Sequence, residues 1–331
     1  MKALIPVAGA GTRLRPHTYT QPKPLIPVAG KPILAHIIDE LLEANFDEFI
    51  FVIGYLGEKI KDYVGKRYKN LNCQFVVQEE RNGLAHAVWS ARKFIQNEES
   101  LFIALGDTVF DMDMTEMLKT TTTCLGVKEV KDPREFGVVE MDDKGFVKKV
   151  IEKPRIPRSN MAMVGLYKVL EVKELLSAIE YNITHDIKPN GEFQLADAFQ
   201  RMIEQGVKIT TLPVNNWFDC GKKEILLDTN RMLLQKHNVY DVDLPIFENT
   251  IVVHPVSIGE GCDIQDSIIG PYVSIGDNTV IKASIIQDSI IGSFSNLNEI
   301  ILNQSIIGSD SALRGIKRSL NIGDNTEIDF R

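Results

Sequence analysis

Residues 7–32 read VAGAGTRLRPHTYTQPKPLIPVAGKP, an irregular stretch between two segments of regular pattern. The segment before it, residues 2–7, is a short apolar run that predicts a buried β-strand. The segment after it, residues 32–44, carries apolar side chains at helical spacing and predicts a helix that covers a sheet. Because open α/β sheets bind ligands at the carboxyl ends of their strands, the stretch predicts where the functional site lies.

The same stretch combines glycines with cations. Gly9 and Gly11 allow the backbone N–H groups to approach a ligand closely, and Thr12 adds a hydroxyl donor. Arg13 and Lys23 bring positive charge that suits phosphate oxygens. Glycines at a strand end are often only a turn, but their combination with cations predicts a polyphosphate site.

The chain continues to alternate after this loop. Apolar runs predict strands at residues 48–53, 73–78 and 100–105, and amphipathic patterns predict helices at residues 57–68 and 84–95. This alternation is typical of a mostly parallel, Rossmann-like sheet with helices on both faces. The fold class expected for the N-terminal part is therefore α/β.

Two aspartates are candidate metal ligands. Asp107 follows the run at residues 100–105, so it is expected at the same edge of the sheet as the glycine-rich loop. A carboxylate there suits magnesium bound to phosphates, although capping of a turn is an equally ordinary use of aspartate. Asp219 lies near the start of a helix predicted at residues 217–235, where it could be only an N-cap.

The pattern changes after residue 124. Strands are predicted at residues 125–130, 162–169 and 207–214, with a hairpin over residues 136–154 and a helix over residues 191–205. We expect residues 1–236 to form one domain, with halves of about 1–123 and 124–236. Residues 237–250 are expected to be a linker.

The C-terminal part repeats. Ile-Gly recurs at residues 258, 275, 291, 307 and 322, and single aliphatic residues fall every five or six positions between these pairs. This spacing predicts a solenoid with three short strands per coil, over residues 251–331. It resembles a left-handed parallel β-helix. Because an open end of stacked strands promotes aggregation, we expect this domain to assemble the chain into a homo-oligomer.

Composition limits the class of protein. The formal net charge of −8 argues against coating of nucleic acid, and no apolar run approaches the length of a membrane span. The four cysteines have no paired spacing and are expected to be reduced thiols in a cytoplasmic protein. Because the chain as a whole is acidic, Arg13 and Lys23 of the N-terminal loop are expected to serve a ligand at that loop and not a basic surface.

Several motifs together resemble one enzyme family. G-x-G-T-R-L-x-P from Gly9 and P-K-P-L-I-P-V from Pro22 resemble the sugar-1-phosphate nucleotidylyltransferases, nearest to glucose-1-phosphate thymidylyltransferases of the long form with a C-terminal β-helix. Further resemblance lies in Q-x4-G-L-A-x-A from Gln78, F-G-V-V from Phe136, E-K-P from Glu152, and W-x-D-x-G from Trp217. The resemblance covers nearly the whole chain.

The resemblance assigns roles to particular residues. It implies catalytic roles for Arg13 and Lys23, nucleotide binding by Ala8, Gly9, Gly11, Thr12, Gln78 and Gly83, sugar-phosphate binding by Gly137, Glu152, Lys153, Gly165 and Glu192, and a Mg²⁺ ion held by Asp107 and Asp219. The half at residues 1–123 would then bind the nucleotide, and the half at residues 124–236 the sugar.

The activity that the resemblance implies is synthesis of a nucleoside-diphosphate sugar with release of pyrophosphate. The amide of Gln78 suits the edge of uracil or thymine, because it donates and accepts. We therefore expect a pyrimidine triphosphate, with glucose 1-phosphate and dTTP first and UTP second. The alternatives are a purine-using relative such as a mannose-1-phosphate guanylyltransferase, or a non-catalytic regulatory or scaffolding subunit.

Overall fold

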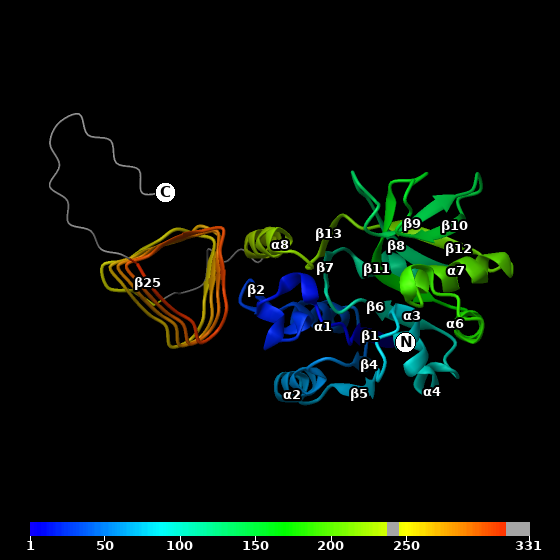
Figure 1. The fold of residues 1–331 in the computed structure, drawn as a ribbon, viewed down its shortest axis with the longest axis horizontal. Helices are drawn as coiled ribbons and strands as arrows, with labels where there is room; N and C mark the ends of the chain where they lie inside the picture. The colour runs from blue at the N-terminus through cyan, green and yellow to red at the C-terminus, as the bar shows by residue number, and fades with distance from the viewer. Residues whose placement is uncertain (237–244, 316–331) are drawn as a thin grey trace. The chain divides into compact units, whose positions relative to one another are not determined.

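The computed structural model describes residues 1–236 and 245–315, and the chain divides into two compact units (Figure 1). The N-terminal unit comprises Met1–Pro27 with Lys31–Thr229. The C-terminal unit comprises Val28–Gly30 with the chain from Asn230 onward. Within the described residues, no helix combines the length and apolar character that a membrane crossing needs.

The N-terminal unit is built on a nine-stranded sheet whose main order is β10-β9-β11-β6-β1-β4-β5. Its parallel part consists of β1 (Lys2–Val7), β4 (Glu48–Ile53), β5 (Asn72–Val77) and β6 (Leu101–Ala104). The connecting helices are α1 (Ile33–Glu43), α2 (Gly57–Arg67), α3 (Leu84–Ser90) and α4 (Arg92–Ile95). The α/β fold expected from the alternation of apolar runs is confirmed for this part.

The remaining strands of this sheet pair in a mixed pattern. They are β8 (Thr123–Glu129), β9 (Gly137–Met141), β10 (Val147–Glu152), β11 (Met161–Val169) and β12 (Ile209–Pro213). Strand β11 is antiparallel to β6, β8 and β9, and β12 is parallel to β8. Helices α6 (Val172–Thr184) and α7 (Leu195–Glu204) pack beside them. Because β11 pairs with β6, the two expected halves share one sheet.

One hydrophobic core also spans both halves. Leu4 and Ile103 from the parallel strands belong to the same buried cluster as Tyr167 of β11 and Phe199 of α7. The rings of Tyr167 and Phe199 meet edge to face with centroids 5.3 Å apart. Burial of such side chains contributes roughly 1.5–3 kcal/mol each to folding, so this core fixes the strand ends that carry the site.

Shorter elements complete the unit. They are β2 (Pro27–Val28), β3 (Lys31–Pro32), β7 (Thr108–Asp111), α5 (Met114–Lys119), β13 (Asn216–Asp219) and α8 (Lys223–Lys236), with 3-10 turns at Thr12–Leu14, His17–Tyr19, Lys23–Leu25 and Pro189–Gly191. α8 continues past the boundary between the two units.

Three helix predictions were wrong in position. Residues 216–219 form β13 instead of opening a helix, because β7 supplies their backbone hydrogen bonds, and α8 begins only at Lys223. The helix predicted from residue 191 begins at Leu195, since Phe193 is held by backbone bonds to Asn82 and Ala85. The helix predicted over residues 84–95 is interrupted at Ala91.

The C-terminal unit consists of three stacks of parallel strands, as the repeat predicted. The stacks are β14 (Ile251–Val252), β17 (Ile268–Ile269), β20 (Ile285–Gln287) and β23 (Ile301–Asn303); β15 (Val256–Ile258), β18 (Val273–Ile275), β21 (Ile290–Ile291) and β24 (Ile306–Ile307); and β16 (Asp263–Gln265), β19 (Val280–Lys282), β22 (Asn296–Asn298) and β25 (Ala312–Arg314). Each coil contributes one strand to each stack, which is consistent with a left-handed β-helix.

Aliphatic side chains fill the inside of these coils. Ile264, Ile281 and Leu297 follow one another in register and are buried, as are Ile269 and Ile286 on another side. The Ile-Gly pairs at residues 258, 275, 291 and 307 thus fall in a stacked repeat. The pair at residues 322–323, and residues 237–244 of the expected linker, lie outside the described residues.

Candidate active site

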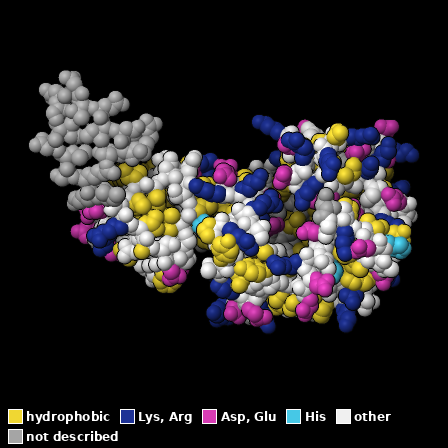
Figure 2. Space-filling model, in the orientation of Figure 1, with side chains coloured by type: hydrophobic (Ala, Val, Ile, Leu, Met, Phe, Trp, Pro, Cys, Tyr) yellow, Lys and Arg dark blue, Asp and Glu magenta, His cyan; other side chains and the backbone are white. Residues whose placement is uncertain are grey.

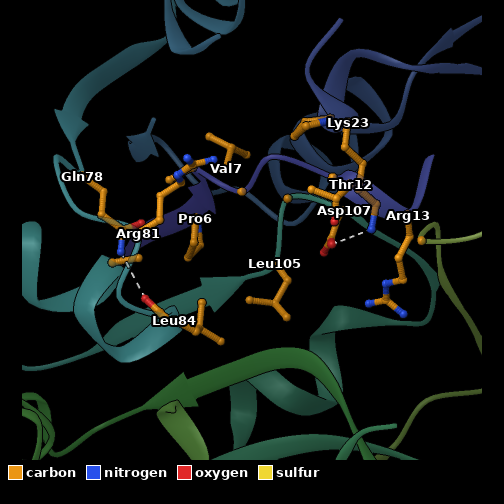
Figure 3. Close-up of a pocket in the computed structure, with 18 of the residues that line it drawn as sticks. Pro6, Val7, Thr12, Arg13, Lys23, Gln78, Arg81, Leu84, Leu105 and Asp107 are labelled. Atoms are coloured by element: carbon orange, nitrogen blue, oxygen red, sulfur yellow. Dashed lines mark hydrogen bonds and ion pairs between the residues drawn. The ribbon is translucent and has the colours of Figure 1, made fainter. Parts of the chain in front are cut away.

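The candidate site is a pocket of about 410 Å³ in the N-terminal unit (Figure 3). It lies at the carboxyl ends of β1 and β6, where the loops after these strands meet. The lining residues that sequence reasoning had singled out are Ala8, Gly9, Gly11, Thr12, Arg13, Lys23, Gln78, Gly83, Asp107 and Glu192. The structure therefore brings together most of the predicted nucleotide, metal and catalytic residues.

The glycine-rich loop folds tightly on itself beside this pocket. Gly11 has φ 60°, and its carbonyl accepts hydrogen bonds from the Leu14 N–H at 3.0 Å and the Thr18 hydroxyl at 2.9 Å. A Cβ atom on Gly11 would stand 2.9 Å from the Lys23 Cβ. The loop thus requires glycine at this position for two reasons, and it packs directly on the segment that carries Lys23.

Lys23 bridges the two candidate metal ligands. Its Nζ lies 2.6 Å from Asp107 Oδ2 and 3.3 Å from Asp219 Oδ1, and its side chain is only 8% exposed. Asp219 ends β13, which pairs with β7 so that Asp219 lies opposite Thr108, and the Cys220 N–H donates to the Asp107 carbonyl at 3.1 Å. The strand pairing that sequence reasoning missed is therefore what joins these aspartates.

The charges of this group stabilise one another. Burial opposes the charge of Lys23, but the carboxylates of Asp107 and Asp219 outweigh it and raise the Lys23 pKa. Burial likewise opposes ionisation of Asp107, but Lys23 and, more weakly, Arg13 outweigh it and lower the Asp107 pKa. Lys23 and Asp107 are both charged near neutral pH as a result.

The donor set of this group fits a divalent cation. Asp107 and Asp219 aim two carboxylates at one positive charge, and hard oxygen ligands are what Mg²⁺ prefers. Within the described residues, no cluster of three or more acidic, histidine or cysteine side chains could hold a metal alone. A cation bound here would take its other ligands from water and substrate phosphates, as Mg²⁺ ordinarily does.

Arg13 lies at the same end of the pocket (Figure 3). Its side chain is 55% exposed, and its contact with the exposed Glu135 is a long 3.8 Å. An exposed ion pair of this kind contributes little to stability. The guanidinium is therefore available to a ligand in the pocket.

The opposite end of the pocket carries Gln78, which is only 5% exposed (Figure 3). Its Nε2 donates to the Gly83 carbonyl at 3.1 Å and lies 3.2 Å from His86 Nδ1. Because the Gly83 carbonyl only accepts, the orientation of the amide is fixed, and His86 accepts through Nδ1. The Gln78 Oε1 atom is left to receive a hydrogen bond.

Gly83 connects this end with Glu192. Gly83 has φ 101°, and a Cβ atom there would stand 2.5 Å from the Phe193 carbonyl oxygen and 2.9 Å from the Glu192 Cβ. Only glycine tolerates both the backbone conformation and this close approach. The segment with Glu192 therefore packs directly against the predicted base-binding element.

The other predicted sugar-phosphate residues do not belong to the pocket lining. Lys153 Nζ is 3.7 Å from Glu152 Oε1, and a Cβ atom on Gly137 would stand 3.0 Å from Glu152 Oε2. Gly165, with φ 84°, lies against the Leu105 side chain. Glu152, Lys153 and Gly137 thus lie together outside the pocket lining. Figure 2 shows Lys and Arg side chains gathered on the surface around β9 and β10.

Asp197 adds a further carboxylate to that group. Its Oδ2 is buried and has no hydrogen-bond partner among the described residues, and burial raises its pKa to about 6. Burial also raises the pKa of Glu152, opposed by Lys153 and reinforced by Asp197 and Glu192. Asp197 is therefore a partly buried carboxyl on α7 whose pKa is set by burial.

Sequence reasoning also passed over two residues near Gln78. Arg81 lines the pocket, and its guanidinium lies over the Tyr55 ring at 5.9 Å (Figure 3). His86 holds the Gln78 amide. Both lie inside or next to the Q-x4-G segment, so their closeness to Gln78 in the chain was the available signal.

A glycine-rich loop with nearby cations, a pair of carboxylates suited to a divalent cation and a buried amide are the features expected of an enzyme that transfers nucleotidyl groups. Residues 2–236 match the family model described as Nucleotidyl transferase, and the chain belongs to this family. The resemblance to sugar-1-phosphate nucleotidylyltransferases found in the sequence motifs is confirmed.

Individual relatives match over different lengths. The low-salt glycan biosynthesis nucleotidyltransferase Agl11 of Haloferax volcanii is 30% identical over 99% of both chains. A glucose-1-phosphate thymidylyltransferase of Streptomyces antibioticus is 29% identical over the full length of both. A bifunctional protein GlmU of Methanocaldococcus jannaschii is 38% identical over 79% of this chain, which spans only 61% of that protein.

A solved structure shows the same fold. A UDP-glucose pyrophosphorylase complexed with UDP-glucose superposes with a TM-score of 0.62 and 24% identity, over 71% of this chain and 98% of that one.

Proposed function

We propose that this enzyme joins a sugar 1-phosphate to the nucleotidyl group of a pyrimidine nucleoside triphosphate, most simply glucose 1-phosphate with dTTP or UTP. The observation that carries the proposal is the bridge of Lys23 between Asp107 and Asp219 at the phosphate end of the pocket. The buried Gln78 at the other end supports a base-binding role. The named activity of the thymidylyltransferase relative supports the choice of glucose 1-phosphate and dTTP.

The reaction asks mainly for positioning and neutralisation of charge. A phosphate oxygen of the sugar 1-phosphate attacks the α-phosphorus of the triphosphate, and pyrophosphate leaves from the opposite side. Backbone N–H groups of Gly9 and Gly11, with the Thr12 hydroxyl, would hold the triphosphate. Arg13 and Lys23 would neutralise the charge that develops on the α-phosphate and the leaving pyrophosphate.

A Mg²⁺ ion held by Asp107 and Asp219 would supply further neutralisation of the phosphate oxygens. The ammonium of Lys23, which contacts both carboxylates, would hold phosphate oxygens of the substrates beside this site.

The fixed amide of Gln78 supports a choice among bases. Its Oε1 accepts a hydrogen bond, and the N3–H of uracil or thymine is a donor of the right kind. Cytosine and adenine present an acceptor at the equivalent ring position and would meet the oxygen unfavourably. Guanine presents a donor, so a purine-using relative stays the alternative that this atom alone does not separate.

The sugar-binding part of the proposal rests on the carboxyl groups. Glu192 lines the pocket and would accept hydrogen bonds from sugar hydroxyls. Glu152 and Lys153, with Gly137 beneath them, would receive the sugar phosphate outside the present lining, and Gly165 would support Leu105 beside them. The alternative of a non-catalytic subunit is disfavoured because Arg13, Lys23 and both aspartates are retained.

We also propose a cytoplasmic location, where nucleoside triphosphates are supplied. All four cysteines, Cys73, Cys124, Cys220 and Cys262, are free thiols, which agrees with a reducing compartment.

The test is pyrophosphate release in the presence of Mg²⁺. Each of dTTP, UTP, GTP, ATP and CTP is paired with the 1-phosphates of glucose, N-acetylglucosamine, galactose and mannose. Release confined to dTTP or UTP supports the base assignment and identifies the sugar. Release with GTP keeps the enzyme class but overturns the pyrimidine choice, and no release with any pair supports the non-catalytic alternative.

A further inference from the structure

One end of the pocket holds a cation to which the proposed reaction gives no role. Arg81 lines the pocket together with two other cations, Arg13 and Lys23. Figure 3 shows Arg81 beside Gln78. The same view shows Arg13 and Lys23 at the other end of the pocket, beyond Leu105. Arg81 is therefore placed next to the proposed base site and away from the proposed phosphate site.

The short loop that carries Arg81 is held by hydrogen bonds on both sides of this residue. The Asn82 N–H donates to the Glu80 carbonyl at 2.9 Å, and the Asn82 side chain donates to the Glu80 carboxylate at 2.8 Å. The Asn82 carbonyl accepts a hydrogen bond from the Phe193 N–H at 2.8 Å, which ties the loop to the segment before α7. The loop therefore presents Arg81 from a fixed backbone, three positions after Gln78.

An aromatic ring supports the side chain of Arg81. The guanidinium carbon lies 5.9 Å from the centroid of the Tyr55 ring. Tyr55 is itself tied to the glycine-rich loop, because its N–H donates to the Ala8 carbonyl at 3.3 Å and its hydroxyl to the Tyr19 carbonyl at 3.2 Å. Among the residues that the structure describes, no carboxylate forms an ion pair with Arg81. The guanidinium is therefore supported by a ring, and a ligand in the pocket can reach its N–H groups.

We propose that Arg81 donates a hydrogen bond to a carbonyl oxygen of the base, next to the ring N–H group that donates to Gln78. This inference rests on the base-binding role proposed above for Gln78. The Gln78 Oε1 atom only accepts hydrogen bonds, and a guanidinium only donates them. The two side chains together therefore require a base that has an N–H group directly beside a carbonyl group.

This requirement distinguishes the bases. Uracil and thymine carry the N3–H group between two carbonyls, so they satisfy both side chains whichever side of N3 Arg81 reaches. Cytosine places an acceptor opposite the Gln78 oxygen and an amino group on one side of it. Guanine has a carbonyl on one side of N1–H and an amino group on the other, and adenine has no carbonyl. Arg81 thus strengthens the selection of uracil and thymine.

Apolar side chains make a mismatch at this end unfavourable. Pro6, Val7 and Leu84 line the pocket on the same side as Gln78 and Arg81 in Figure 3. A base that binds against them displaces water from the guanidinium, which then needs an acceptor from the base itself. A base that turns an amino group toward Arg81 leaves donors on both sides without a partner. The apolar wall therefore increases the effect of Arg81 on base choice.

The test is a double-mutant cycle between the protein and the base. Arg81→Met removes the donors and keeps an unbranched side chain. The analogues 2-thio-UTP and 4-thio-UTP each replace a different carbonyl oxygen by sulfur, which is a weaker acceptor. Dissociation constants are measured by isothermal titration calorimetry with Mg²⁺ and without a sugar 1-phosphate, so that no turnover occurs. If dTTP binds and UTP does not, the corresponding analogues of dTTP take their place.

The expected result is a dependence on one carbonyl that disappears with Arg81. In wild type, sulfur at the carbonyl that Arg81 contacts should weaken binding about tenfold, because the charged donor loses a good acceptor. In Arg81→Met the same replacement should weaken binding less than about twofold. Sulfur at the other carbonyl should have the same effect in both proteins. Such a result at either carbonyl supports the contact, because a purely structural role of Arg81 would not depend on the base.

Arg92→Met is the matched control. Arg92 also lies over an aromatic ring, that of Trp89 at 4.7 Å, but it does not line the pocket. This variant should bind UTP and both analogues as wild type does. Thermal unfolding is recorded for both variants, and Arg81→Met should unfold like wild type because Arg81 is exposed.

Three results would overturn the contact. If neither analogue distinguishes Arg81→Met from wild type, Arg81 does not bind the base. If Arg81→Met weakens the binding of UTP, CTP and inorganic tripolyphosphate equally, Arg81 binds the phosphates instead. If wild type binds GTP or ATP but neither UTP nor dTTP, the proposed pyrimidine function is wrong, and this inference is wrong with it. The first two results leave the proposed function intact, so the two failures are distinguishable.

Discussion

Asp107 and Asp219 lie side by side although they are far apart in the sequence. Asp219 lies opposite Thr108 in the antiparallel pair of β7 and β13, and both carboxylates contact the ammonium of Lys23, at 2.6 and 3.3 Å. Lys23 is 84 positions from one and 196 positions from the other. Three distant segments therefore make one group of charges, and its balance is the basis of the first two predictions.

Removal of the Lys23 ammonium should nearly abolish turnover. Lys23→Met should lower kcat by about 10²–10³-fold, because the charge that neutralises the phosphates is lost. The measurement is steady-state pyrophosphate release with Mg²⁺. Lys31→Met is the matched control, since Lys31 pairs with Asp39 away from the pocket. Equal activities of the two variants would show that Lys23 has only a structural role.

The carboxylate pair should bind a divalent cation without substrates. Asp219→Asn should weaken Mn²⁺ binding at least about tenfold, measured by electron paramagnetic resonance of the free ion, because a neutral amide replaces one of two charged ligands. Lys23→Met should strengthen it, since the competing ammonium is gone. Asp113→Asn, which changes an exposed cap of α5, is the control. If Asp219→Asn binds Mn²⁺ as tightly as wild type, Asp219 is not a ligand of the metal.

The packing of Gly83 should couple the base and sugar parts of the site. Gly83→Ala should raise the KM of both substrates, because its Cβ displaces the Phe193 carbonyl and with it Glu192. The expected loss of stability is roughly 2–4 kcal/mol, of which about 1 kcal/mol is backbone strain. Gly145→Ala isolates the strain, since Gly145 has φ 82° and nothing within 4 Å of an added Cβ. If Gly83→Ala and Gly145→Ala have equal effects on chemical denaturation and on the kinetics, the close packing of Gly83 has no such role.

His86 should act on base choice through Gln78. His86→Leu removes one of the two hydrogen bonds that orient the Gln78 amide and leaves only the bond to the Gly83 carbonyl, so the ratio of kcat/KM for the preferred pyrimidine over CTP should fall about tenfold. His185→Leu is the control, because His185 stacks on Tyr181 away from the pocket. An unchanged ratio in the His86 variant would show that other contacts hold the amide.

The buried carboxyl of Asp197 should make the free energy of unfolding depend on pH. Burial raises its pKa to about 6 from 3.8, so the folded state binds a proton that the unfolded state has released between these values. Stability should therefore fall as pH rises through this window and stay lower above it. Asp197→Asn should stabilise the protein at pH 8 by at most about 3 kcal/mol and change little at pH 4. The measurement is the free energy of unfolding of both proteins in denaturant at pH 4 and pH 8. If Asp197→Asn gains the same stability at both pH values, the effect comes from packing and not from protonation.

The regular elements could be predicted where the pattern is local. The apolar runs of β1 and β4 matched the structure residue by residue, because strands buried on both faces need continuous aliphatic sequence. The repeat fixed the stacks of the C-terminal unit for the same reason, since each coil repeats one local pattern. Predictions failed at residues 191–194 and 216–219, where hydrogen bonds to distant segments override local propensity.

The sequence by itself determined the kinds of residues that the site contains: a glycine loop with cations, an amide, and two aspartates, one after an apolar run and one near the start of a predicted helix. Only the tertiary structure decided which of them meet. The pairing of β7 with β13 joins the aspartates, and the amide of Gln78 is oriented by Gly83 and His86. The physical reason is that local pattern reports burial and backbone preference, whereas contacts between distant residues follow from how the whole sheet closes its hydrogen bonds and its core.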